Sequence, residues 1–173
     1  MASDSSSTPP TSEDCDAEAH EFLRQLNLDS LCKIASAKRH GVPCTPGGNI
    51  IGEHNVVQEL AFKDGTVWLA RIPRPDACFQ LDESTLSYAA VLRYLKKHTD
   101  IPVPTVFGYA AASDPGNTLG VGYILMEKLP GRKMPSLDSD EHGDQDYTPP
   151  PKHVHWARKV HQQLTDITID LGQ

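Results

Sequence analysis

The middle of the sequence predicts a β-hairpin, in the stretch Val56–Pro73, which reads VVQELAFKDGTVWLARIP. Two runs rich in β-branched and apolar residues, Val56–Phe62 and Val67–Ile72, flank the dipeptide Asp64-Gly65. An Asp-Gly pair between two such runs favours a tight turn. Proline cannot donate to a strand ladder, so Pro73 should end the second strand. We therefore expect two antiparallel strands joined by a short turn.

The residues before this hairpin predict a helical segment and then a glycine-rich loop. Apolar residues recur with a helical period from Ala17 to His40. We expect Asp29 to cap a second helix inside this segment and Gly41 to end it. Three glycines lie between the segment and the hairpin, at Gly47, Gly48 and Gly52.

The residues after the hairpin predict a helix and two more strands. A helix over Glu83–His98, capped by Asp82, has apolar residues near one face. The strands are expected at Thr105–Tyr109 and Tyr123–Met126. The expected fold class is α+β, with a small antiparallel sheet and a packed helix, flanked by amino-terminal helices and a carboxy-terminal helix.

The composition divides the chain into four segments. The start is rich in Ser, Thr, Pro and acidic residues, and the region Leu137–Asp146 is too polar to pack, so both are expected to be mobile. Apolar residues recur at helical spacing near the end. The expected segments are a disordered tail (1–16), a folded lobe (17–135), a mobile acidic and proline-rich linker (136–151) and a terminal amphipathic helix (152–173).

The charge and the cysteines favour a soluble protein that binds neither nucleic acid nor membrane. The chain has 16 Lys and Arg against 23 Asp and Glu, a formal net charge of -7 that repels a phosphate backbone. It shows no signal peptide and no run of about 18 apolar residues. The four cysteines are dispersed and form no CxxC pair, which favours reduced thiols and a cytoplasmic location. They are Cys15, Cys32, Cys44 and Cys78.

Four blocks of the sequence carry a family resemblance. They are Gly48–Leu60, Phe62–Pro73 (FKDGTVWLARIP), Arg93–Pro104 and Tyr123–Gly131 (YILMEKLPG). In this order they resemble the amino-terminal lobe of fungal aminoglycoside phosphotransferase-like proteins, a kinase-like and choline-kinase-related family. The resemblance runs from about Leu31 to the end. It implies a kinase-like lobe with its hinge over residues 17–135.

The resemblance also implies a nucleotide or ligand site, with ATP and Mg as the possible cofactor. Gly48–Asn55 would form a loop over the phosphates, Arg71 would take the position of the phosphate-contacting lysine, and Met126–Leu129 would form the hinge. The implied binding residues are Gly48, Asn49, His54, Asn55, Arg71, Met126, Glu127 and Leu129. The alternatives are that Arg71 is an ordinary strand residue, that the glycines only permit a turn, and that the hinge is a plain strand end.

The sequence departs from the family in two ways. Tyr88 stands where the helical glutamate that pairs with the basic strand residue is expected, and Glu83 lies five residues earlier, in a poor position to replace it. The family's catalytic and metal-binding aspartates follow the helix at which this chain ends, and His142-Gly143-Asp144 matches the catalytic motif only superficially. No catalytic residue is identified, and the scattered histidines form no convergent metal site.

The expected function is that of a truncated phosphotransferase-like chain that binds a nucleotide or small metabolite as a binding or accessory module. One alternative is an enzyme completed by a partner chain. Another is a repurposed lobe with metal-free chemistry on a fungal metabolite. The apolar stripe of the terminal helix predicts a homodimer or a partner protein.

Overall fold

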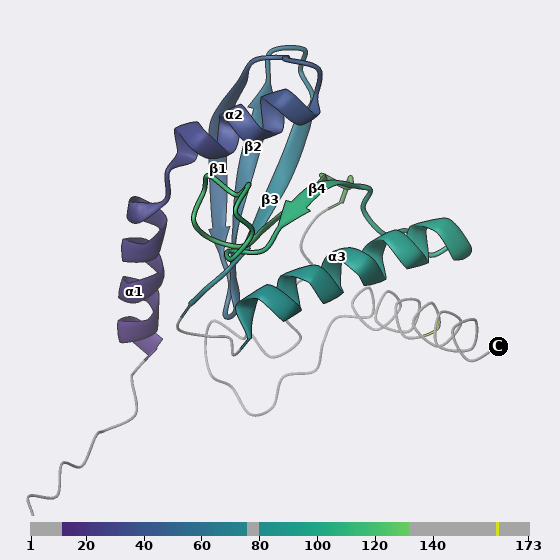
Figure 1. Cartoon of the computed structure of the whole chain (residues 1–173). Helices are drawn as coiled ribbons and strands as arrows, with labels where there is room; N and C mark the ends of the chain where they lie inside the picture. Colours follow the sequence, from purple (N-terminus) through teal and green to yellow (C-terminus); the bar gives the residue numbers. More distant parts are fainter. Residues whose placement is uncertain (1–11, 76–79, 132–161, 163–173) are drawn as a thin grey trace, which may run out of the picture. The chain divides into compact units, whose positions relative to one another are not determined.

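The structure is a computed structural model that describes residues 12–75, 80–131 and 162. Three helices and five strands lie among these residues, in the order α1-α2-β1-β2-β3-α3-β4-β5 (Figure 1). The chain divides into two units, residues 1–129 and 130–173, and all of these elements belong to the first unit. The predicted α+β class with an antiparallel sheet is confirmed.

Helices α1 and α2, at Ser12–Gln25 and Leu28–Lys38, precede the sheet. Helix α1 begins inside the predicted disordered tail. The predicted cap at Asp29 is wrong, because Asn27 is the N-cap of α2 and its side chain accepts a hydrogen bond from the Ser30 N–H at 2.9 Å. Asp29 lies in the first turn instead, where a carboxylate interacts favourably with the positive end of the helix.

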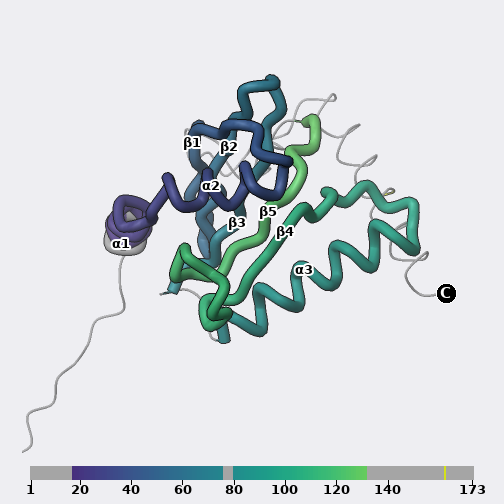
Figure 2. Tube along the Cα trace, turned by 45° about the horizontal axis from the view of Figure 1, so that its top comes forward, coloured from purple at the N-terminus to yellow at the C-terminus, as the bar shows by residue number. Residues whose placement is uncertain are grey.

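The five strands form one antiparallel sheet in the order β1-β2-β3-β5-β4, which Figure 2 shows along the Cα trace. The predicted hairpin is confirmed, with Leu60 opposite Trp68 and Ala61 opposite Val67. Gly65 has a φ of 85° at its turn and donates its N–H to the Phe62 carbonyl. The strands are β1 (Cys44–Ile51), β2 (Asn55–Phe62), β3 (Val67–Pro73), β4 (Val106–Ala110) and β5 (Tyr123–Glu127).

The glycine-rich segment is a strand where we predicted a loop. Its residues up to Ile51 belong to β1, an edge strand whose register shifts between Pro46 and Asn49. A Cβ on Gly47 would lie 3.1 Å from the Cβ of Glu59, so glycine lets the two strands approach closely. Proline and glycine concealed the strand from the sequence analysis, and only the residues between β1 and β2 form the turn.

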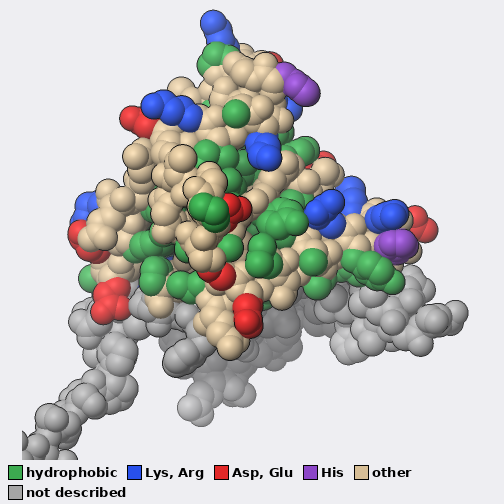
Figure 3. Space-filling view, viewed as in Figure 1, with side chains coloured by type: hydrophobic (Ala, Val, Ile, Leu, Met, Phe, Trp, Pro, Cys, Tyr) green, Lys and Arg blue, Asp and Glu red, His purple; other side chains and the backbone are tan. Residues whose placement is uncertain are grey.

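Helix α3 spans Leu81–His98, and its predicted cap is also wrong. Gln80 is the N-cap residue, and its side chain makes no capping hydrogen bond. The Asp82 carboxylate instead accepts hydrogen bonds from the Ala112 and Ser113 N–H groups. The Ser113 side chain, followed by these backbone bonds, lowers the pKa of Asp82. Asp82 therefore fastens the start of α3 to the loop after β4. In Figure 3, hydrophobic side chains lie along α3 and basic ones at its carboxyl end, where cations favour the helix dipole.

The two faces of the sheet have different surroundings. The core face packs against α1 and α2, and the alternating burial of β2 and β3 places every second residue there. The opposite face, which we call the open face, is partly covered by α3. The buried core residues are Leu26, Leu31, Cys32, Ala35, Leu60, Phe62, Trp68, Ala70, Ile72, Ala110, Leu119, Tyr123 and Leu125. The open face carries Val57, Glu59, Leu69, Arg71, Ile124 and Met126.

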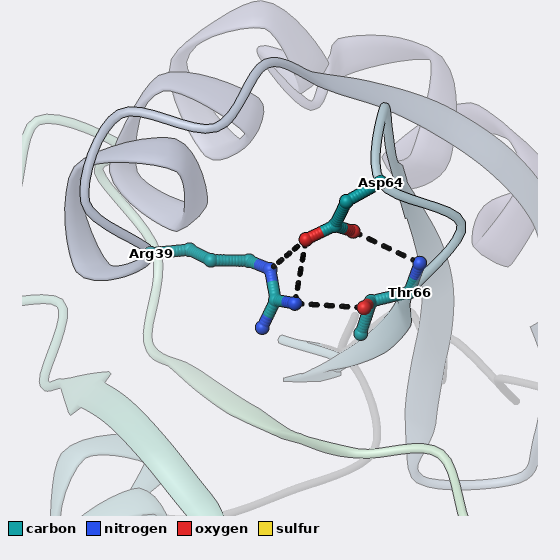
Figure 4. Close-up of polar contacts among 3 residues, drawn as sticks. All are labelled: Arg39, Asp64 and Thr66. Carbon is teal, nitrogen blue, oxygen red and sulfur yellow. Dashed lines mark hydrogen bonds and ion pairs between the residues drawn. The ribbon is translucent and has the colours of Figure 1, made fainter.

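Arg39 joins the end of α2 to the β2–β3 hairpin (Figure 4). Its guanidinium donates to the Asp64 carboxylate at 2.7 and 3.1 Å and to the Thr66 hydroxyl at 2.7 Å. It also lies over the rings of Phe62 and Trp68, at 5.1 and 5.5 Å from their centroids. Arg39 therefore ties α2 to the hairpin from outside the core.

Several predictions from the sequence fall on the second unit. The predicted linker (136–151) lies outside the described residues. The stretch within it that was predicted to be mobile, residues 137–146, lies outside them as well. Of the predicted terminal helix (152–173) the structure describes only Gln162, which is helical. The helix and the homodimer inferred from it stay predictions.

Candidate functional site

Arg71 and Tyr88 face each other on the open face of the sheet. Arg71 pairs in register with Val57 on β2 and with Ile124 on β5. Its guanidinium carbon lies 3.9 Å from the centroid of the Tyr88 ring on α3, a cation–π contact. Within the part of the chain that the structure describes, no carboxylate forms an ion pair with Arg71. Tyr88 thus lies opposite Arg71, as the sequence indicated. A tyrosine ring carries no carboxylate, so Tyr88 does not compensate the charge of Arg71.

A cavity of about 160 Å³ lies beside this pair, and we call it the Arg71 cavity. It brings together three of the predicted binding residues, from the turn before β2, from the first position of β2 and from β3. Helix α3 supplies the opposite wall. The lining residues are His54, Asn55, Arg71, Pro73, Ser84, Thr85 and Tyr88.

Arg74 fixes the turn at the edge of this cavity, and sequence analysis missed it. The side chain is buried, with 3% of its surface exposed, and it donates to the Gly52 carbonyl at 3.2 Å. Its backbone N–H donates to the His54 carbonyl at 3.0 Å. The Pro-Arg-Pro sequence around Arg74 signals only the end of a strand, so nothing local indicates this contact with the preceding turn.

The predicted hinge residues lie elsewhere on the sheet. Met126 pairs with Leu69 and shares the open face with Arg71. The Glu127 carboxylate accepts hydrogen bonds from the backbone N–H and the hydroxyl of Thr105, at 3.0 and 2.8 Å. These bonds and the nearby Lys96 hold the pKa of Glu127 below its ordinary value. The Glu127 side chain therefore fastens β5 to the start of β4, and it is engaged inside the fold.

The remaining predicted residues do not join either group. Gly48 and Asn49 are exposed on the edge strand β1, and Leu129 is 39% exposed after β5. None of these three lines the Arg71 cavity. The structure therefore brings together His54, Asn55 and Arg71. The predicted hinge residues and the two predicted residues of the edge strand β1 lie apart from them.

An ion pair crosses the open face near the end of β5. The Lys128 ammonium donates to the Glu59 carboxylate, which lies on β2. The two residues are 69 positions apart in the sequence, so no local pattern could have indicated the pair. It bounds the apolar surface that Leu69 and Met126 form.

Neither a cluster of metal-ligating side chains nor a membrane-spanning helix is present among the described residues. No group of three or more His, Cys, Asp or Glu side chains among them is placed to hold a metal ion. None of the helices among them is long and apolar enough to cross a bilayer.

The fold and this site define the chain as an α+β protein with a cation on the open face of its sheet. The chain is similar to two subtelomeric hrmA-associated cluster proteins from Aspergillus fumigatus, one from each of two strains. Each is 37% identical over 94 residues, which cover 52% of this chain and 18% of the relative. The chain thus spans less than a fifth of the length of these relatives, and neither name states an activity. No family model matches the chain, and no solved structure matches it.

Proposed function

We propose that this chain is a binding module for a phosphorylated small molecule, a nucleotide such as ATP, which binds on the open face with a phosphate in the Arg71 cavity. The observation that carries the proposal is the Arg71 guanidinium, which lies on an aromatic ring and has no carboxylate partner among the described residues. A phosphate would supply the missing negative charge, and the planar guanidinium can donate two parallel hydrogen bonds to it.

The size of the cavity restricts what it can hold. Pockets that enclose drug-sized ligands have volumes of about 300–1,000 Å³, and the Arg71 cavity, at about 160 Å³, is smaller. It suits a phosphate group and not a whole nucleotide. The base and ribose would extend along the open face toward Leu69 and Met126, whose side chains are only half-buried.

The order of elements supports a kinase-like amino-terminal lobe as the origin of this arrangement. A hairpin leads into a strand that carries a cation, then into a helix that faces this cation, and then into two strands. The tyrosine opposite Arg71 favours binding over phosphoryl transfer, because a neutral ring cannot hold the cation in place as a carboxylate would. No carboxylate is among the described residues that line the Arg71 cavity, so in this proposal Mg²⁺ would arrive with the nucleotide phosphates.

Calorimetric titration of the full chain with ATP, with and without Mg²⁺, tests the proposal. Arg71→Ala should raise the Kd roughly tenfold or more, because a hydrogen bond to a charged group contributes about 1.5–3 kcal/mol. Arg93→Ala is the matched control, since Arg93 also lies over a tyrosine ring, that of Tyr109, and bonds its hydroxyl at 3.3 Å. It should leave the Kd unchanged.

Pyrophosphate and adenosine separate the two halves of the ligand. Pyrophosphate should bind and compete with ATP, whereas adenosine alone should bind much more weakly. Equal affinities of the wild-type and Arg71→Ala chains for ATP would refute the proposal, as would binding that Arg93→Ala weakens to the same degree.

A further inference from the structure

Two cysteines line a second and larger groove, which lies between α2 and the edge strand β1 and has a volume of about 560 Å³. Cys32 lies in α2 and is 7% exposed, and Cys44 is the half-buried first residue of β1. Both belong to described parts of the chain, and neither is in a disulfide. The groove includes no residue of the Arg71 cavity, so the proposed function does not use it.

The two thiols share one groove. Both side chains line it at the interface of helix and strand, and each thiol shifts the pKa of the other. The Cys44 thiol can itself donate to the Thr45 carbonyl, at 3.9 Å. Two thiols at one interface can form a disulfide when the backbone lets their Cα atoms come within about 7 Å of each other.

The two thiols differ in their ease of ionisation. Burial, with smaller contributions from the neighbouring Cys44 and Asp29, raises the pKa of Cys32 to about 12. Burial also raises the pKa of Cys44, but there the neighbouring Cys32 acts in the opposite direction. Cys44 is therefore the thiol that ionises first, and it is also the more exposed of the two.

We propose that Cys32 and Cys44 form a dithiol modification site, which low-molecular-weight disulfides such as oxidised glutathione convert to an intramolecular disulfide. The Cys44 thiolate, after losing its proton to solvent, attacks one sulfur of the small disulfide and releases one small thiolate. The Cys32 thiol then loses its proton and attacks the Cys44 sulfur, which releases the second. The two protein thiols are oxidised, and one small disulfide is reduced to two thiols.

The geometry favours closure within one chain over stable capping of Cys44. The groove admits the small disulfide to Cys44, and Cys32 lines the same groove as the sulfur that it must attack. The disulfide would tie α2 to β1 across the turn that contains Arg39 and Gly41. Such a link limits the freedom of the unfolded chain, so it should stabilise this fold.

The test uses the full chain with Cys15→Ser and Cys78→Ser, which leaves only the two thiols of the groove. Incubation with oxidised glutathione should remove both titratable thiols and lower the mass by two hydrogen atoms. The Tm should rise by several degrees, and dithiothreitol should reverse both changes. Adding Cys32→Ala should stop the reaction at one glutathione on Cys44, because no second thiol can displace it.

A displaced thiol is the matched control. Cys44→Ser with Thr45→Cys moves the thiol one residue along β1 and therefore to the other face of the strand, where closure with Cys32 should fail. Three results would overturn the proposal: both thiols still titratable under conditions that oxidise dithiothreitol, a stable glutathione adduct on the chain that retains Cys32, or a disulfide that links two chains.

Discussion

Arg39→Ala should destabilise the folded lobe although Arg39 lies outside the hydrophobic core. The guanidinium makes three kinds of contact at one place, with the Asp64 carboxylate, the Thr66 hydroxyl and two aromatic rings of the core (Figure 4). Alanine removes all of them and uncovers the edge of the Phe62 and Trp68 pair, whose centroids lie 4.8 Å apart. No new contact replaces them.

The expected loss is roughly 2 kcal/mol of unfolding free energy. The Thr66 hydrogen bond contributes about 1 kcal/mol, and each ring contact contributes about 0.5–1 kcal/mol at a partly exposed site. The Asp64 pair adds little, because solvent reaches both side chains and screens their attraction. A loss of this size is a large part of the about 5–15 kcal/mol that stabilises a domain.

Urea unfolding followed by Trp68 fluorescence measures this loss. Trp156→Phe removes the other tryptophan, so the signal comes from the residue that Arg39 covers. The urea midpoint should fall by roughly 1 M with an unchanged slope, since slopes are about 1–3 kcal/mol per M for small domains. Arg39→Lys should lose nearly as much, because an ammonium lacks the planar face and the fork.

Asp64→Asn is the control for the ion pair. A hydrogen bond from the Thr66 backbone and another from Arg39 lower the pKa of Asp64, so its contribution is present above the unfolded pKa and fades as the pH falls through the lower folded value. At neutral pH this variant should unfold close to the wild type. If Arg39→Ala also unfolds at the wild-type midpoint, or if Asp64→Asn accounts for its whole loss, the ring contacts are not what stabilises this corner.

Two more predictions concern how α3 and β5 are held. Gly122→Ala should lower the free energy of unfolding by about 1–3 kcal/mol, because a Cβ there would lie 2.8 Å from the Thr85 hydroxyl oxygen. Adding Thr85→Ala should restore part of this loss, which thermal unfolding would measure. Glu127→Gln should flatten the pH dependence of stability. Hydrogen bonds from Thr105, with Lys96 nearby, lower the pKa of Glu127 in the folded state. The wild-type carboxylate therefore stabilises the fold above its unfolded pKa, and this contribution is lost as the pH falls through the lower folded value. The Tm of the wild type and of Glu127→Gln, measured from acidic to neutral pH, would contradict this if both changed by the same amount with pH.

The sequence predicted elements whose local signals agree with their tertiary surroundings. The β2–β3 hairpin was predictable because alternation, β-branched residues and the Asp-Gly turn all indicate the same structure. Strand β1 was missed because Pro46, Gly47 and Gly48 are typical of a loop, whereas the close approach of Glu59 requires a residue without a side chain there.

The helix caps show the limit of local reasoning. Both Asn27 and Asp29 are good capping residues, and position alone does not choose between them. Asp82 fits the cap position by type, yet it bonds N–H groups of the loop after β4, about 30 residues further along the chain. The loop after β4 thus takes the Asp82 carboxylate that could have capped α3. No local pattern in the sequence shows this contact.

The candidate site divides in the same way. Arg71 and Tyr88 were found facing each other because their positions on a strand and a helix were read correctly. The Arg74 contact with Gly52 depends on how the chain folds back at the end of β3, and its local sequence does not indicate it. The residues of the predicted hinge lie at the end of β5 and after it, and the bonds of Glu127 to Thr105 were not foreseen.

Contacts other than that of Arg71 with Tyr88 also hold α3 on the sheet, which supports the proposed binding role of Arg71. The helix is already fastened by Asp82 at its first turn and by the close contact between Thr85 and Gly122. A half-buried guanidinium loses part of its hydration, and a ring contact of about 0.5–1 kcal/mol offsets little of that cost. An ion pair would offset more, and the described residues offer Arg71 none. Under the proposed function, a phosphate that arrives from solution neutralises this charge.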